Sequence, residues 1–374
     1  MFYNEGTMRY VAIFIFISVV LTAGYFYFFT GPSADFGFPV LDVKALAYSD
    51  IFLSPINSAG RVKPTLEEVK GVHLSYGFYF SERFNAFLAE ALSSPINTFV
   101  FEIKDPFGRV AVYDDAHISR IKGLLLQLER YGIHTVARMV LFQDPVLIES
   151  QPDLAIQNIR TKSVWVDFKG VKWADPTQYK VWEYNAQIAR AAKELGFDEI
   201  NFDYVRFPTD GPLDDARYAG LENFKDKADV IANFLQFVRG ELGTNTKLSI
   251  DVFGMTFIND QYEIGQVLER LAPFVDILAP MPYPSHYPDG FIGLENPAEY
   301  PYDVIDYTLQ RGRAKLADFP DVIIRPWLQD FSLGAVYDSE KILAQIQAAN
   351  DNGSNSWLFW NSANRYSFSA YSDK

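Results

Sequence analysis

Residues 196–211, GFDEINFDYVRFPTDG, carry the side chains best suited to chemistry. The segment begins with alternating apolar residues, typical of a buried strand, and then presents Asp203 and Arg206. A helical pattern over 179–196 precedes it and ends at a glycine. A helix followed by a strand that ends in an acid and an arginine predicts one unit of a β/α barrel, whose active site lies at the C-terminal ends of the strands.

A second carboxyl group, that of Asp251, ends the next strand-like run. Two carboxyl groups that flank a scissile bond are what glycoside hydrolysis requires. Arg206 follows Asp203 closely, and a neighbouring cation favours the ionised form of an acid. Asp251 stands between Ile250 and Val252, and an apolar site raises the pKa of a carboxyl group. We therefore expect Asp203 to be the nucleophile or base and Asp251 to be the general acid.

Further polar and aromatic residues fall where the other strand-like runs end. Sugar faces stack on aromatic rings, although each of these aromatic residues fits a core position equally well. Asp105 and Asp144 precede prolines, and Asp-Pro also favours the start of a turn. The expected substrate contacts are His73, Asp105, Asp144, Arg206, Tyr283, His286, Tyr287, Arg325, Trp327, Gln329, Asp330, Trp360 and Asn361.

Eight apolar runs are strand candidates, and helical patterns that end near glycines lie between them. Strands buried on both faces read as continuous apolar runs, and alternation with helices favours a parallel sheet. Eight such units predict an α/β fold of the (β/α)₈ TIM-barrel type. The candidates are 71–77, 97–105, 134–144, 199–207, 247–254, 275–283, 322–330 and 356–364.

Composition excludes several classes of protein. The chain has 374 residues, a formal net charge of −14, four histidines and no cysteine. Nucleic-acid binding needs a basic footprint, so we expect no nucleic-acid partner. Disulfides, thiolate zinc sites and cysteine nucleophiles are absent. We expect no metal and no cofactor, and a neutral polymer such as a polysaccharide fits the acidity.

The uncharged run at 10–29 predicts an attachment to the membrane. About 20 apolar residues match the hydrocarbon core of a bilayer. Arg9 precedes the run and no basic cluster follows it, which places the body of the chain outside the cytoplasm. A cleaved signal peptide is the alternative, and it too exports the body. The expected organisation is a cytoplasmic tail (1–9), an anchor (10–29), a spacer (30–65) and a barrel (66–374), in a single-pass cell-membrane protein.

The segment 284–302, which follows the sixth strand candidate, is long and rich in Pro, Gly and Tyr. Long loops at the C-terminal face of a barrel usually carry function. We therefore expect it to form one wall of a substrate cleft, with Tyr283, His286 and Tyr287 toward the ligand.

Several blocks resemble, in order, a family of bacterial glycoside hydrolases with a TIM-barrel fold, distantly similar to the α-amylase-type glycosidases. They are FEIKDPFGRV, ARMVLFQDPVL, the long block ending in DYVRFP, SIDVFG, APMPYPSHYPDG, RPWLQDF and WLFWNSANRYS, and they span about residues 70–366. The resemblance implies that Asp203 occupies the place of the nucleophile. Asn201 stands where those enzymes usually have an arginine, and Asp251 where they have a glutamate. Retaining and inverting stereochemistry both stay open.

Two other functions are compatible with the sequence. A non-catalytic barrel that binds surface glycans would need the aromatic residues but no carboxyl pair. A metal-assisted polysaccharide deacetylase would need His and Asp ligands around an open metal position. His73 is a candidate ligand, but the four histidines show no paired ligand spacing. The strand-end acids favour the glycosidase.

Overall fold

Nine parallel strands form the central sheet of the computed structural model, which describes residues 61–371. Their order is β10-β11-β1-β2-β3-β5-β7-β8-β9. All eight strand candidates contribute to this sheet, and the candidate at 322–330 supplies two short strands. The bounds are β1 Lys70–Leu74, β2 Thr98–Lys104, β3 His134–Val140, β5 Glu199–Asp203, β7 Lys247–Phe253, β8 Ile277–Met281, β9 Ile323–Ile324, β10 Trp327–Gln329 and β11 Trp357–Trp360.

The two end strands of the sheet are consecutive in the sequence. Only Arg325 and Pro326 separate β9 from β10. The Arg325 N–H donates to the Leu278 carbonyl of β8 at 3.0 Å, and the Pro326 carbonyl accepts from the Leu358 N–H of β11 at 2.9 Å. Proline has no N–H to donate, so it interrupts the strand at this point. The chain therefore has a TIM-barrel-like α/β fold, as the alternation of strands and helices predicts.

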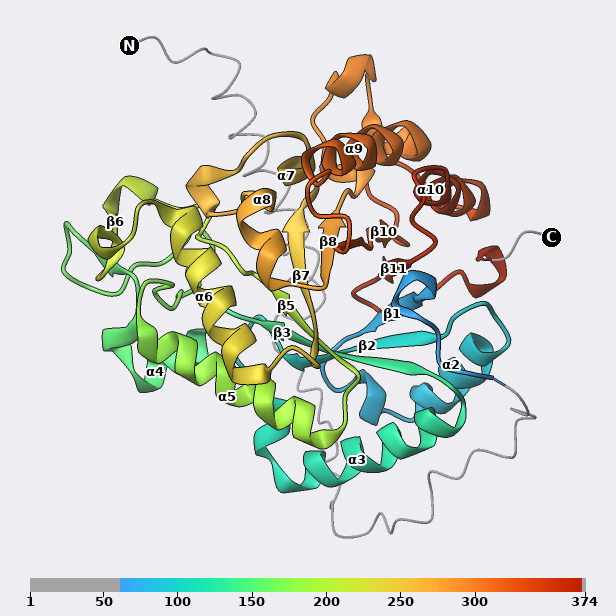
Figure 1. Cartoon of the computed structure of the whole chain (residues 1–374), viewed down its shortest axis with the longest axis horizontal. Helices are drawn as coiled ribbons and strands as arrows, with labels where there is room; N and C mark the ends of the chain where they lie inside the picture. The colour runs from blue at the N-terminus through green and yellow to red at the C-terminus, as the bar shows by residue number, and fades with distance from the viewer. Residues whose placement is uncertain (1–60, 372–374) are drawn as a thin grey trace, which may run out of the picture.

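The helices surround the strands (Figure 1). Asp114, Asp226 and Asp338 accept a backbone N–H three residues ahead and so cap the first turns of α3, α6 and α10. Each long helix buries its apolar face against the sheet. The bounds are α2 Arg83–Leu92, α3 Asp115–Arg130, α4 Pro145–Ser150, α5 Tyr179–Leu195, α6 Lys227–Leu242, α7 Gly254–Ile258, α8 Leu268–Leu271, α9 Pro301–Lys315 and α10 Ser339–Asp351.

Alternate residues of each strand face the inside of the barrel, as the two-residue period of a strand dictates. A small inner apolar cluster is separate from the main core between sheet and helices. It includes Val100, Val136, Trp327 and Leu358. Polar side chains occupy the inner positions above and below this cluster. The upper group lies toward the C-terminal ends of the strands, where chemistry is expected.

Two long connections form a small lobe, which we call the β4–β6 lobe (residues 151–178 and 204–226). Its antiparallel sheet joins β4 (Gln157–Asn158) to β6 (Ala216–Arg217). Gly211 packs so closely that a Cβ atom there would lie 2.6 Å from the Trp165 ring. The connections leave from the ends of α4 and β5, so the lobe lies beside the C-terminal end of β5.

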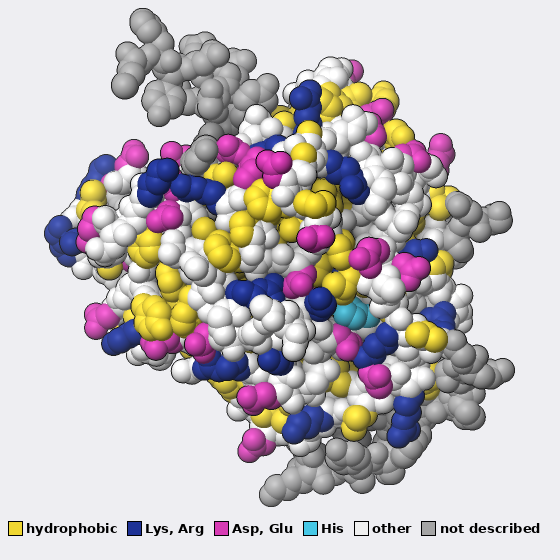
Figure 2. All heavy atoms as spheres, viewed as in Figure 1, with side chains coloured by type: hydrophobic (Ala, Val, Ile, Leu, Met, Phe, Trp, Pro, Cys, Tyr) yellow, Lys and Arg dark blue, Asp and Glu magenta, His cyan; other side chains and the backbone are white. Residues whose placement is uncertain are grey.

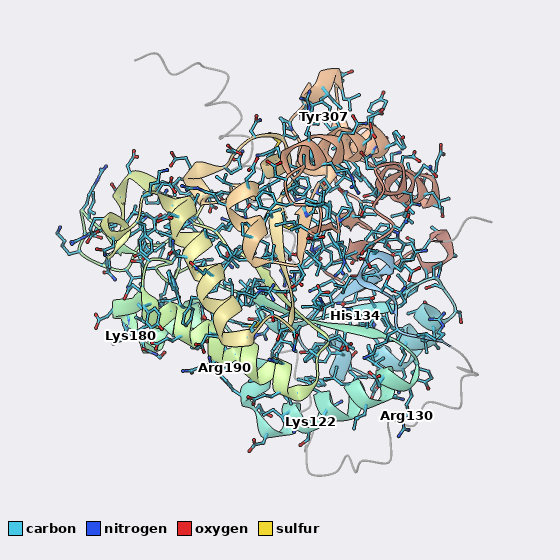
Figure 3. All side chains as sticks on the ribbon, viewed as in Figure 1. Lys122, Arg130, His134, Lys180, Arg190 and Tyr307 are labelled. Atoms are coloured by element: carbon cyan, nitrogen blue, oxygen red, sulfur yellow. The ribbon has the colours of Figure 1, made fainter. Side chains whose placement is uncertain are left out.

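The outer helices carry their charges toward solvent. Lys122 and Arg130 of α3 and Lys180 and Arg190 of α5 project away from the strands, whereas His134 lies at the start of β3 (Figure 3). Positive and negative side chains are interspersed over this face (Figure 2). Within residues 61–371, no helix is long and apolar enough to span a bilayer. The anchor predicted at 10–29 lies outside the described residues.

Candidate active site

One arginine, Arg138 of β3, contacts three carboxyl groups inside the barrel. Its guanidinium is bound to Asp203 of β5, donates to Glu102 of β2 at 2.8 Å, and lies 3.7 Å from Asp251 of β7. All four side chains are buried. The neighbouring anions outweigh burial and raise the pKa of Arg138 above its usual value, so the guanidinium stays charged. The two expected catalytic acids therefore share one cation.

Asp203 occupies the last position of β5 and is the more accessible of the two acids. Its residue is 6% exposed, against 1% for Asp251. One carboxylate oxygen binds Arg138, and the other accepts the Tyr204 N–H at 2.6 Å. Tyr204 has a φ of 52°, in the left-handed region that non-glycine residues rarely adopt. Backbone strain of this kind clusters at functional sites, and here it orients the carboxylate of the preceding residue.

Asp251 is the more buried of the two acids, and its environment favours the protonated form. Burial and the nearby Asp203 carboxylate raise the pKa of Asp251 to about 8 from an ordinary 3.8. One oxygen accepts hydrogen bonds from Asn201 Nδ2 at 2.9 Å and from Trp327 Nε1 at 2.7 Å. The other faces the Arg138 Nε. A carboxyl group that keeps its proton at neutral pH is suited to act as a general acid.

Glu102 and His73 complete the polar cluster. Burial raises the pKa of Glu102, but His73 and Arg138 outweigh it and lower the pKa to about 2, so this carboxyl group is ionised. Burial lowers the pKa of His73 and favours the neutral ring. That ring stacks on Trp360, with centroids 3.9 Å apart, and Arg138 lies over the same indole at 4.8 Å.

Aromatic side chains around the cluster stay partly exposed. They are contributed by loops that follow β1, β5 and β10 and by the last residues of β7 and β11. Rings with one exposed face suit the stacking of sugars. These residues are Tyr76, Tyr204, Phe253, Phe331 and Trp360.

The expected partnership of Arg206 with Asp203 is wrong. In the part of the chain that the structure describes, Arg206 has no carboxylate within ion-pair distance, and Arg138 is the cation that binds Asp203. The Arg206 guanidinium lies instead over the rings of Trp173, Tyr204 and Phe253. The chain turns at Tyr204, and this turn carries Arg206 past the carboxylate and into the lobe.

Asp105 and Asp144 shape their own loops. Asp105 accepts the N–H groups of Phe107 and Arg109 and pairs with the Arg109 side chain. Asp144 caps α4 and lies 2.7 Å from the buried Lys104. The turn interpretation therefore accounts for both, and the structure does not bring either acid onto Arg138.

Three other residues that were expected to contact the substrate, Arg325, Asp330 and Asn361, instead bind structural partners away from Arg138. Arg325 lies at the opposite end of the barrel, where it forms a two-oxygen ion pair with Glu199. Asp330 accepts from Ser367 and Tyr371 and fixes the C-terminal segment. Asn361 donates to the Asp330 carbonyl at 2.5 Å.

The loop 284–302 contacts the site through its first residues. Tyr283 is buried beside the acids, and burial together with Asp251 raises its pKa. The His286 ring lies 5.3 Å from the Tyr283 ring, and Ser285 links it to Gln329 of β10. Tyr287 points away: its hydroxyl lies 2.9 Å from Thr308 of α9.

Sequence reasoning missed Glu102, Arg138 and Asn201 as site residues. Register brings them together, because Glu102 pairs with Arg138 and Arg138 pairs with Asn201 across neighbouring strands. The sequence did contain a signal, because Arg138 is a charged residue in the middle of an otherwise apolar strand. A buried charge needs a partner, and in a parallel barrel strand such a partner is found in the barrel interior.

In the described part of the chain, no group of three or more His, Cys, Asp or Glu side chains is arranged to hold a metal ion. Two open pockets of about 430 and 680 Å³ lie elsewhere, one beside α2 and one around residues 62–70. Neither is lined by Arg138 or the acids that it contacts.

Comparison with known proteins identifies the class. Residues 71–366 match the model of a family described as "Putative glycosyl hydrolase domain". The chain belongs to this family, and it is a glycosidase of the TIM-barrel type, as the resemblance implied. None of the curated proteins matches the chain.

Several solved structures are similar to the chain. The glycoside hydrolase domain of PgaB (BpsB) from Bordetella bronchiseptica aligns with a TM-score of 0.53 and 12% identity, over 79% of this chain and 94% of that one. A hypothetical protein from Ruminiclostridium thermocellum is 31% identical over 48% of this chain and 97% of its own length, with a TM-score of 0.43. The α-galactosidase TtGalA from Thermus thermophilus aligns with a TM-score of 0.48 and 12% identity, over 81% of this chain and 60% of its own.

Proposed function

We propose that the enzyme cleaves a glycosidic bond of a polysaccharide with Asp203 and Asp251 as its carboxyl pair. The observation that carries the proposal is the division of roles around Arg138. Asp203 is bound directly to the guanidinium and is the more accessible acid. Asp251 has its pKa raised to about 8 by burial and by Asp203. Two carboxyl groups whose environments differ in this way match an acid and its partner base or nucleophile.

The chemistry follows from these environments. Asp251 gives its proton to the leaving glycosidic oxygen as the bond to the anomeric carbon breaks. Asp203 either attacks that carbon, and water later hydrolyses the ester, or removes a proton from an attacking water. Arg138 holds the carboxylate of Asp203 in place. The partly exposed rings of Tyr76, Tyr204 and Trp360 are placed to stack on sugars.

We place this reaction outside the cytoplasm. The uncharged run at 10–29 supports a single-pass anchor in the cell membrane, and a cleaved signal peptide would export the same domain. The substrate would then be a cell-surface or secreted glycan.

The experiment is a hydrolysis screen with the purified protein. Polysaccharides of varied linkage are incubated with the wild type, and new reducing ends are measured. We expect release from at least one of them, and nuclear magnetic resonance of the first product then gives its anomeric configuration. Retention fits a separation of the two carboxyl groups of about 5–5.5 Å, and inversion fits about 6.5–9.5 Å. Binding without cleavage across the whole panel would replace this proposal with the glycan-binding barrel.

A further inference from the structure

Four cationic side chains are buried in the described part of the chain, and one of them differs from the rest. They are Lys104, Arg138, Arg206 and Arg325. Lys104 pairs with Asp144, Arg138 with Asp203 and Glu102, and Arg325 with Glu199. Arg206 is only 7% exposed, yet no carboxylate of residues 61–371 lies within 4.0 Å of its guanidinium. Buried charges are normally paired, so a buried arginine without a carboxylate partner is unusual.

Aromatic rings surround Arg206 on several sides. The guanidinium carbon lies 5.1 Å from the centroid of Trp173, 4.8 Å from that of Tyr204 and 4.7 Å from that of Phe253. These contacts hold the flat group in one orientation, because an arginine stacks on the faces of rings. Rings attract the cation but do not accept its hydrogen bonds in the plane of the guanidinium.

Most of the hydrogen-bonding capacity of Arg206 is unused. Among the described residues, one terminal nitrogen alone has acceptors: it donates to the Phe207 carbonyl at 2.9 Å and to the Thr209 hydroxyl at 3.5 Å. A guanidinium has five N–H donors in a fixed fork. The other two nitrogens of the guanidinium are not fully buried. They therefore lie at the small part of the Arg206 side chain that is exposed. An anion with two oxygens matches such a fork.

Arg206 lies next to the catalytic pair. Tyr204 directly follows Asp203, and Phe253 is two residues beyond Asp251. The third ring, Trp173, belongs to the β4–β6 lobe and donates to Asp167 at 3.1 Å. The guanidinium therefore stands between the end of the barrel and the lobe, where a sugar next to the scissile bond would lie.

Two acids of the lobe are near Arg206, but both are compatible with a bound anion. Asp167 is already occupied, since it accepts from Lys169, Val171 and Trp173. Asp210 is buried with one oxygen unpartnered, and burial followed by the charge of Asp167 raises its pKa. A raised pKa favours the neutral form of this carboxyl group, which would not repel a bound anion.

We propose that Arg206 is the specificity residue of an acidic subsite that receives the carboxylate of a uronic acid unit in the polysaccharide. This inference rests on the proposed function and deepens it by naming the class of substrate. The planar carboxylate would accept hydrogen bonds from the free N–H groups of the guanidinium. The sugar ring would lie against the partly exposed Tyr204 ring.

The first test needs only the wild type. Oligosaccharides of galacturonate, of mannuronate with guluronate, and of glucuronate are each paired with the same oligosaccharide after reduction of its carboxyl groups to alcohols. Calorimetry measures the Kd of both members of each pair. We expect at least one acidic oligosaccharide to bind about 10-fold more tightly than its reduced form, since hydrogen bonds to charged groups are among the stronger ones. Equal affinity within every pair overturns the proposal.

The second test assigns the preference to Arg206. In Arg206→Gln the ratio of the two Kd values should fall to about one, while affinity for the reduced oligosaccharide changes little. Arg206→Lys keeps the charge but not the fork, and it should retain part of the preference. The matched control is Arg311→Gln, because Arg311 also lies over a ring, that of Tyr307, but stands on the outer helix α9. This control should leave the ratio unchanged. A full preference in both Arg206 variants contradicts the assignment.

Failure of this inference can be told apart from failure of the proposed function. If the enzyme cleaves glycans without a preference for acidic units, the catalytic proposal stands and the acidic subsite is wrong. If it binds uronic acid oligosaccharides through Arg206 but cleaves none, the subsite stands and the hydrolytic proposal is wrong.

Discussion

Asp203 and Asp251 have the same side chain and lie on the same guanidinium, yet their surroundings separate them. Asp203 receives a direct ion pair and a backbone N–H, both of which stabilise its negative charge. Asp251 is farther from the cation and more completely buried, so burial dominates and its pKa rises. The two acids therefore differ in their contact with Arg138 and in their burial.

The raised pKa of Asp251 predicts the pH dependence of the enzyme. The acid must hold its proton, so turnover should fall as the pH rises through about 8. Asp251→Asn should reduce turnover by about 10²–10⁴-fold, less for substrates with good leaving groups, and should lose this alkaline limb. Rates measured from pH 5 to 10 on one cleavable substrate check the prediction, and an unchanged alkaline limb in the variant contradicts it.

The same pKa predicts an effect on stability. A carboxyl group whose pKa is higher in the folded than in the unfolded protein contributes stability that is complete below the ordinary value of 3.8 and is lost as the pH rises through about 8. The asparagine side chain of Asp251→Asn cannot ionise, so the variant does not lose this contribution to the free energy of unfolding. The free energy of unfolding, measured with denaturant, should therefore decline less in the variant than in the wild type between pH 5 and 9. A steeper decline in the variant would show that the pKa is not raised.

Sequence reasoning selected Asp203, Asp251, Trp327 and Trp360 from the last parts of the strand-like runs, and the structure brings these four side chains close to Arg138 or Asp251. It assigned the wrong arginine, because nearness along the chain is a poor guide after a strand has turned. Arg138 is far from Asp203 in the sequence but reaches it across neighbouring strands, and only the register of the sheet reveals this. The alternative that Asp-Pro favoured for Asp105 and Asp144, the start of a turn, is the role that the structure gives them.

At the level of elements, the strands were the most predictable part of the fold. Continuous apolar runs identified every strand of the barrel, since both of their faces are buried. The break between β9 and β10 escaped notice, although Pro326 marks it. The β4–β6 lobe was also missed, because its two-residue strands carry no periodic pattern. That lobe contributes Trp173, one of the rings around Arg206.

Two glycines within helices predict opposite effects on stability. A Cβ atom at Gly312 of α9 would lie 1.7 Å from the Phe257 ring of α7, whereas one at Gly240 of α6 would meet nothing within 4 Å. Gly312→Ala should therefore destabilise the protein by about 1–3 kcal/mol through overpacking. Gly240→Ala should stabilise it by about 0.5–1 kcal/mol, because alanine favours the helix. Denaturant unfolding of both variants checks the pair, and equal effects would show that α7 and α9 are not in close contact.

For the whole molecule, the first described residues, from Arg61 onward, show where the N-terminal end of the described chain contacts the barrel. Arg61 donates to the carbonyls of Leu92, Ser94 and Ile96, and Lys63 pairs with Asp198. These contacts hold the incoming chain at the end of the barrel where the strands begin, opposite to Asp203. An anchored enzyme would therefore present its site away from the point of attachment.

The orientation across the membrane is tested with intact cells. The run at 10–29, preceded by Arg9, predicts a barrel outside the cytoplasm. Protease added to spheroplasts should digest the barrel, or release it if the segment before Arg61 is cut first. A cytoplasmic marker protein serves as the control for lysis. Protection of the barrel until the cells are broken would place it inside.

The central claim is that Asp203 performs the chemistry, and the turnover of Asp203→Asn tests it most directly. Asparagine preserves the shape of the side chain but cannot attack or take a proton, so turnover should fall by at least about 10²-fold while the protein stays folded. The matched control is Asp318→Asn, an exposed acid before β9, which should keep wild-type turnover. Both variants are compared on the same cleavable glycan with the folded fraction verified by circular dichroism. Near-wild-type turnover in a folded Asp203→Asn enzyme would contradict the account.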